Sequence, residues 1–295
     1  MSASDAQAAP PAQTAGLPQL ATLLLANVAL ALGPWLVRLA DTGPVAAAFW
    51  RISLALPLLL FFAAREGAVP WRFGRGAIWA VGIAGTFFAL DLASWHLGIE
   101  RTRLGNASLF GNSGSVVLMA WGLIAAQRMP RALEMAAVVC AIAGAGLLVG
   151  GSLQISFESF VGDVFCLAAG MFYAVYILAL RPVRARFGSW GVLAGSSLAS
   201  VPILLAVSLL LRESVWPGDW TPLVVLAMSS QVLGQGALIY SLRFFSPLVI
   251  GLALLTQPAI AAATGWLAFG EMLSARDMIG MLLLAIALVI VRARE

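Results

Sequence analysis

The sequence predicts an all-α polytopic membrane protein with ten transmembrane helices in two inverted five-helix repeats. Of the 295 residues, 61% are hydrophobic and only 10% are charged, whereas about 25% of residues are charged in a typical soluble domain. The mean hydropathy is +0.97, and a soluble chain would need more polar side chains to cover its surface. The apolar residues also form runs long enough to cross a bilayer, and these runs recur at an offset near 144 residues.

Clusters of Arg, Gly and Pro divide the apolar sequence into ten segments, and a transmembrane helix needs about 20 residues. We expect helices at 18–38, 44–64, 77–98, 105–126, 132–150, 161–181, 189–211, 221–241, 246–269 and 275–292. The connections are short, so we expect no domain outside the membrane. Residues 1–17 are rich in Ala, Pro and Gln and contain no Arg, which predicts a disordered cytoplasmic tail rather than a signal peptide.

Arginine is distributed unequally between the two sides of this predicted bundle. Alternate connections place 11 arginines on one side and 5 on the other, and Arg51 lies within a span. The positive-inside rule assigns the richer side to the cytoplasm. Both termini are then cytoplasmic, as an even number of spans requires.

The remaining composition argues against several classes of partner. All 17 basic residues are Arg, and they lie between apolar runs rather than in a patch with aromatic residues, so we expect no nucleic-acid partner. Cys140 and Cys166 lie within apolar runs, where a thiol behaves as a small hydrophobic group. We therefore expect neither a disulfide nor a metal site, and we infer no obligate protein partner.

A weak internal repeat relates the two halves, 18–150 and 151–295. Pro57 and Pro202 coincide at an offset of 145, and the Ala-Ile-Ala of 141–143 recurs at 285–287. A nearly constant offset predicts a duplicated five-helix unit. Because five is odd, the second copy is inverted, as in alternating-access transporters whose substrate site lies between the repeats.

Two stretches carry a family resemblance, namely GPWLVRLADTGPVAAAFWR at 33–51 and DLASWHLGIERTRLGNASLFGN at 91–112. With them, the chain resembles the EamA-type exporters of the drug/metabolite transporter superfamily over residues 18–292. The resemblance implies a multi-pass exporter in the bacterial inner membrane rather than an enzyme, and it implies no cofactor. Exporters of this type move amino acids, including aromatic ones, or other small metabolites and cationic drugs.

Four residues near the outer ends of the second and third helices are unusual at membrane depth. At 1.5 Å per residue, Arg51 and Asp91 lie about 10 and 13 Å below those ends, where they could form a structural ion pair or a gate. His96, the only histidine, could take part in proton coupling or bind a carboxylate. Trp95 could stack on an aromatic or cationic substrate. The alternative for Trp95 and His96 is an interfacial aromatic belt.

The strongest site prediction rests on polar residues at equivalent depth in the two repeats. Asn112-Ser113-Gly114 aligns with Thr256-Gln257-Pro258 at an offset of 144, so each repeat combines polar groups with a residue that weakens a helix. Polar side chains could instead bond neighbouring helices to each other, which we favour for serines. We expect the substrate site to contain Trp95, His96, Asn112, Ser113, Tyr173, Gln231, Thr256 and Gln257. We expect hinges at Pro34, Pro57, Pro202 and Pro258.

This mostly neutral, amide-rich cavity suits a small amphipathic zwitterion, and amino acids are the first expectation. A phosphate carrier would need several cations, and Arg51 is the only one available. Cationic drugs and other metabolites are the alternative substrates. A remote alternative is an intramembrane serine protease, because 111–114 has the form G-x-S-G. Its nucleophile Ser113 would lie about 13 Å into its helix and its base His96 only about 5 Å below the outer end, whereas the two must be within hydrogen-bond reach.

Overall fold

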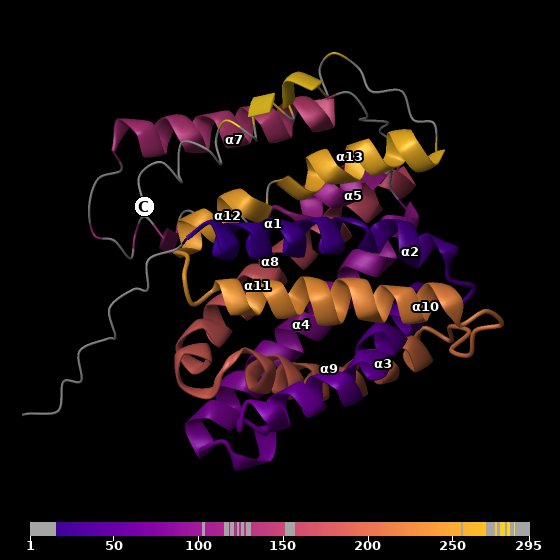
Figure 1. Ribbon diagram of the computed structural model, residues 1–295. Coiled ribbons are helices and arrows are strands. Elements are labelled where there is room, and N and C mark those ends of the chain that lie inside the picture. The colour runs from indigo at the N-terminus through magenta and orange to yellow at the C-terminus, as the bar shows by residue number, and fades with distance from the viewer. Residues whose placement is uncertain are drawn as a thin grey trace, which may run out of the picture.

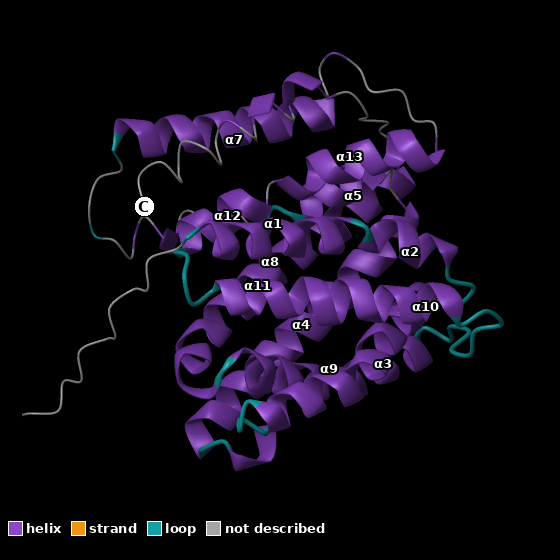
Figure 2. Ribbon diagram, in the orientation of Figure 1, coloured by secondary structure: helices purple, strands orange, loops and turns teal. Residues whose placement is uncertain are grey.

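The computed structural model describes residues 16–101, 104–114, 131–150, 157–254 and 256–269, together with single positions within 118–127 and 275–286. Every regular element in these ranges is helical, and the helices form a bundle (Figures 1 and 2). The elements are α1 (Leu17–Ala31), α2 (Gly33–Leu39), α3 (Pro44–Arg65), a 3₁₀ turn (Pro70–Arg72), α4 (Arg75–Arg101), α5 (Leu104–Gly111), α7 (Ala132–Gly150), α8 (Phe157–Phe187), α9 (Ser189–Leu210), α10 (Thr221–Leu226), a π-helical segment (Ala227–Gln235), α11 (Gly236–Ser241), α12 (Pro247–Leu254) and α13 (Thr256–Phe269).

Six helical stretches of the described chain are long and apolar enough to cross a membrane. They are Leu17–Leu39, Pro44–Arg65, Arg75–Arg101, Phe160–Arg184, Ser189–Leu210 and Thr221–Ser241. Each corresponds to a helix expected from the sequence. The expected helix at 275–292 falls largely outside the described residues, as does most of the expected tail at 1–17.

The first expected helix is interrupted, and α1 ends where α2 begins around Leu32. Pro34 lies in the first turn of α2, where its missing N–H costs little. Pro57 and Pro202 behave differently, because α3 and α9 continue through them. Pro258 lies in the first turn of α13 and is buried.

The helix α4 lies in the middle of the bundle and packs against α3, α8 and α9. Phe88 of α4 stacks on Tyr176 of α8 with ring centroids 4.5 Å apart. Ser200 of α9 donates a hydrogen bond to the carbonyl oxygen of Gly85 at 2.7 Å. A Cβ at Gly85 would lie 2.5 Å from the Ser196 carbonyl oxygen, so glycine permits the close approach of α4 and α9, as small residues do between membrane helices.

A carboxylate at one end of the α3–α9 pair caps α9. Glu66, directly after α3, accepts hydrogen bonds from the N–H groups of Ser189, Trp190 and Gly191 at 3.0, 2.8 and 3.3 Å. These groups lack partners within the helix, and the helix dipole favours an anion there. Gly188 precedes α9 with φ of +77°, and a side chain at that position would collide with the Glu66 carboxylate.

The same arrangement recurs at the opposite end with the two helices exchanged. Glu213, after α9, accepts hydrogen bonds from the N–H groups of Val45 and Ala46 in the first turn of α3, at 3.3 and 2.7 Å. Burial raises the pKa of the Glu213 carboxyl group, and these hydrogen bonds act in the opposite direction. Glu66 and Glu213 lie 147 residues apart, close to the repeat offset. Each helix therefore begins where the other ends, so α3 and α9 are antiparallel, as an inverted repeat requires.

Candidate functional site

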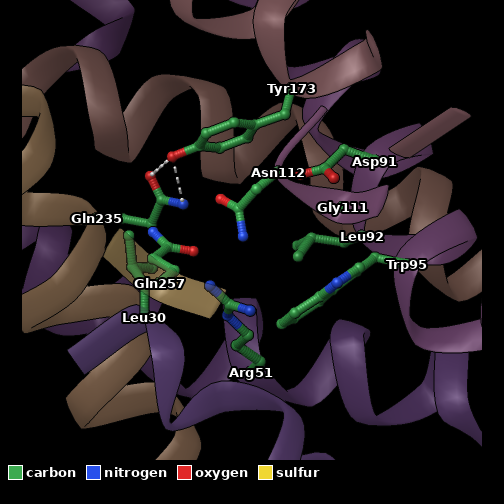
Figure 3. A pocket seen from close by; sticks show the side chains of 10 residues that line it. All are labelled: Leu30, Arg51, Asp91, Leu92, Trp95, Gly111, Asn112, Tyr173, Gln235 and Gln257. Carbon is green, nitrogen blue, oxygen red and sulfur yellow. Dashed lines mark hydrogen bonds between the residues drawn. The ribbon is translucent and has the colours of Figure 1, made fainter. Parts of the chain in front are cut away.

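A cavity lies between elements from both halves of the chain. Ten residues line it (Figure 3), namely Leu30, Arg51, Asp91, Leu92, Trp95, Gly111, Asn112, Tyr173, Gln235 and Gln257. The space inside it is about 60 Å³, whereas small-molecule sites span about 300–1,000 Å³. In this conformation the cavity is therefore smaller than a typical small-molecule site and would have to widen to hold a metabolite.

The two charged lining residues come from neighbouring helices, Arg51 from α3 and Asp91 from α4. Their side chains are only 2% and 8% exposed. Figure 3 shows the Arg51 guanidinium pointing into the cavity from one side and Asp91 lying on another side. Among the described residues, no direct ion pair joins them, so the expected pairing of Arg51 with Asp91 is absent from this conformation.

Trp95 forms one wall of the cavity, one helical turn after Asp91 on α4. Glycines make room for its indole ring on two sides. A Cβ at Gly111 of α5 would lie 2.7 Å from the indole Nε1, and one at Gly33 would lie 3.4 Å from the ring. The ring therefore lies against both the α1–α2 interruption and the end of α5.

Amide side chains from both halves reach the cavity. Asn112 lies in the turn that directly follows α5 and donates to the Ser108 carbonyl oxygen at 2.6 Å. Gln257, in the first turn of α13, donates to the Oδ1 of Asn27 on α1 at 3.0 Å. Asn27 is fully buried, and sequence reasoning missed it because a single Asn in an apolar helix has no pattern that identifies its partner.

Tyr173 of α8 and Gln235 complete the polar lining. The Tyr173 hydroxyl and the Gln235 amide lie within hydrogen-bond distance, at 3.3–3.4 Å. Gln235 ends the π-helical segment, and π turns are rare and frequent at functional sites. We expected Gln231 here instead, but it is fully buried and donates to Ser197 Oγ of α9 at 3.2 Å. The wider π turn changes which face each residue presents, and a 3.6-residue period does not predict it.

Three other expected site residues lie outside the cavity lining. His96 is fully buried, and its Nδ1–H donates to the Pro44 carbonyl oxygen at 2.8 Å. Ser113 Oγ donates to the Leu167 carbonyl oxygen at 3.4 Å, and Thr256 Oγ1 donates to the Ala253 carbonyl oxygen at 2.7 Å. These side chains bond to backbone carbonyl groups in this conformation.

These bonds also bear on the protease alternative. A serine nucleophile must be hydrogen-bonded to its base. Here Ser113 Oγ donates to the Leu167 carbonyl oxygen, and the Nε2 of His96 has no hydrogen-bond partner among the described residues. In the described part of the chain, no group of three or more His, Cys, Asp or Glu side chains is placed to hold a metal ion. The cavity offers one guanidinium, one carboxylate, amides, a phenol and an indole, which suit binding.

Comparisons with known proteins give consistent matches. The chain is 25% identical over 228 residues to the threonine/homoserine exporter RhtA of Escherichia coli strain K12, covering 76% of this chain and 74% of that protein. It is 31% identical over 150 residues to an uncharacterized transporter of Archaeoglobus fulgidus, a match that covers 48% of each protein. The chain thus spans about half the length of this archaeal relative.

A solved crystal structure has the same fold, with a TM-score of 0.75 over 94% of this chain and 98% of the other, at 18% identity. The EamA-like transporter family matches the sequence twice, at residues 18–150 and 160–293. The two matched regions agree with the repeat seen in the sequence and together cover nearly the whole chain. The chain therefore belongs to the EamA-like transporter family.

Proposed function

We propose that this membrane transporter exports small amphipathic metabolites, amino acids first, across the bacterial inner membrane, and that the described cavity is its substrate site. The observation that carries the proposal is the cavity itself. Both halves of the chain line it, and it combines one guanidinium and one carboxylate with neutral hydrogen-bonding groups. An amino acid presents the complementary charges, and the amides can bond a polar side chain.

Alternating access is the transport mechanism that we propose. The halves 18–150 and 151–295 would move against each other around the cavity, with both termini in the cytoplasm. The antiparallel α3–α9 contact and the site between the halves support this, because inverted repeats bind substrate at their interface. The α1–α2 interruption at Pro34 is the best-supported hinge, since it adjoins Trp95 of the cavity.

The substrate class draws support from one relative, whose name describes a threonine/homoserine exporter. The test is counterflow. Purified protein is reconstituted into proteoliposomes, preloaded with unlabelled L-threonine, and the uptake of labelled L-threonine is measured against empty liposomes. We expect uptake above the empty liposomes and a clear reduction by Asn112→Ala or Gln257→Ala. The matched control is Gln127→Ala, which removes an exposed amide outside the cavity.

The outcomes separate the parts of the proposal. Wild-type rates in folded Asn112→Ala and Gln257→Ala would contradict the assigned site. Failure to transport any of the 20 amino acids, with folded protein, would remove the amino-acid assignment. Uptake that requires an imposed pH gradient would indicate proton coupling, for which Asp91 in the cavity is the first residue to substitute and buried His96 the second.

Cationic drugs are the second candidate substrates, and one observation favours them. Asp91 and Trp95 lie one helical turn apart on the cavity wall, and an anion beside an aromatic face attracts organic cations. Arg51 disfavours the binding of cations, because its positive charge lines the same cavity. Counterflow of a labelled organic cation such as tetraethylammonium, with no competition by any amino acid, would favour this second function.

A further inference from the structure

We propose that Arg51 and Asp91 bind the two charged ends of a zwitterionic substrate, the guanidinium holding the α-carboxylate and the Asp91 carboxylate holding the α-ammonium. This inference rests on the proposed export of amino acids and assigns the groups that recognise them. It replaces the expectation that the two side chains serve mainly each other as an ion pair.

The first support is that two opposite charges are buried close to each other without a direct ion pair between them. Arg51 is 2% exposed and Asp91 is 8% exposed. The Nε of Arg51 has no hydrogen-bond partner among the described residues. A buried charge without close contact to an opposite charge is costly, all the more so at membrane depth. A bound molecule that carries a carboxylate and an ammonium would contact both charges directly.

The second support is the direction of the two side chains. Both line the same cavity from adjacent helices, and in the view of Figure 3 the Asn112 and Leu92 side chains lie in the region between them. A ligand in this space can contact both charges at once, whereas a direct ion pair would close it. Guanidinium groups bind carboxylates in a planar, often bidentate geometry, which fits Arg51 to the carboxylate end.

The third support is the charge balance of the lining. Among the ten lining residues, Arg51 and Asp91 are the only charged ones, so the lining as a whole is neutral, like the zwitterion. At the repeat offset of 144, Gln235 occupies the position that corresponds to Asp91. The charges therefore come from the first repeat alone, while the second repeat contributes hydrogen-bonding groups that suit a neutral polar side chain.

The test uses wild-type protein and three competitors with the same carbon skeleton. Counterflow of labelled L-threonine is measured with external L-threonine, with L-threoninol, which lacks the carboxylate, or with 2,3-dihydroxybutanoate, which lacks the ammonium. We expect each analogue to compete at least tenfold more weakly than L-threonine. Because this comparison needs no substitution, it does not depend on whether a variant folds.

Two variants then assign the charges individually. Arg51→Gln is expected to reduce the preference for threonine over threoninol about tenfold while it retains the preference over dihydroxybutanoate. Asp91→Asn is expected to show the reverse pattern. Arg65→Gln and Asp219→Asn make the same charge changes outside the cavity, and both preferences should remain unchanged in them.

The outcomes distinguish this inference from the proposed function. If wild-type protein transports threonine but both analogues compete as well as threonine, the charge assignment is wrong and amino-acid transport stands. If folded Arg51→Gln and Asp91→Asn keep both preferences, the assignment is also overturned. If wild-type protein transports no amino acid, the proposed function fails, and this inference fails with it.

Discussion

Glu66 offers a quantitative test of how α3 and α9 are held together. Its carboxylate accepts hydrogen bonds from three successive backbone N–H groups at the start of α9, at 3.0, 2.8 and 3.3 Å. Glu66→Ala removes all three bonds and the charge next to the positive end of the helix dipole. We therefore expect the variant to fold with lower stability.

The size of the effect follows from known helix caps. Loss of a capping side chain costs about 0.5–2 kcal/mol, and loss of a favourable charge at a helix terminus costs about 0.3–1 kcal/mol. Glu66 is exposed, so water replaces part of the lost bonding, and we expect a total near 2 kcal/mol. Glu66→Gln keeps an acceptor and loses only the charge, so about half of that loss is expected.

Thermal unfolding of purified protein in detergent, followed by tryptophan fluorescence, measures the change. A loss of 2 kcal/mol corresponds to a decrease in Tm of about 4–8 °C. Glu100→Ala is the matched control, because Glu100 is exposed near the C-terminus of α4, where an acid has no N–H groups to cap. A Tm for Glu66→Ala equal to that of wild type and of Glu100→Ala would refute the reasoning.

Two further substitutions address the cavity. Gly111→Ala places a methyl group 2.7 Å from the Trp95 indole nitrogen, so we expect overpacking to lower the free energy of unfolding by about 1–3 kcal/mol, seen as a lower Tm, and to slow counterflow. Gly82→Ala, where a Cβ has open space, is the control. Equal transport by both variants would contradict the placement of Trp95 on the cavity wall. Gln257→Ala removes an amide from the cavity lining, and loss of one hydrogen bond to bound threonine, worth about 1 kcal/mol, would raise the KM for threonine about fivefold. An unchanged KM would argue that Gln257 serves only to hold α1 and α13 together.

Several features of the site were predictable from residue type and position along the chain. Asn112 and Gln257 belong to segments that align between the two repeats, although the two residues are one position out of register, and both reach the cavity. Arg51 and Asp91 were singled out because charges are expensive within a span. The sequence could not show how Arg51 and Asp91 are placed relative to each other. Two side chains at the same depth can either contact each other or line a cavity between them.

The direction in which the other polar side chains point could not be predicted from the sequence, and the reason is physical. In a soluble helix the apolar stripe marks the buried face, but a membrane helix is apolar towards lipid and towards its neighbours alike. We therefore expected Gln231 in the site, but in the π-helical segment Gln235 reaches the cavity while Gln231 bonds to α9. His96 likewise has no sequence signal for its bond to the start of α3.

By itself, the sequence determined the membrane environment, the positions of the six long apolar stretches and the repeat, because hydropathy and helix-breaking residues act locally along the chain. Only the tertiary structure decided which helices touch, which ends Glu66 and Glu213 cap, and which polar groups meet in one cavity. These relations join residues that lie far apart in the sequence. They depend on the packing of uniformly apolar helices, which no local pattern encodes.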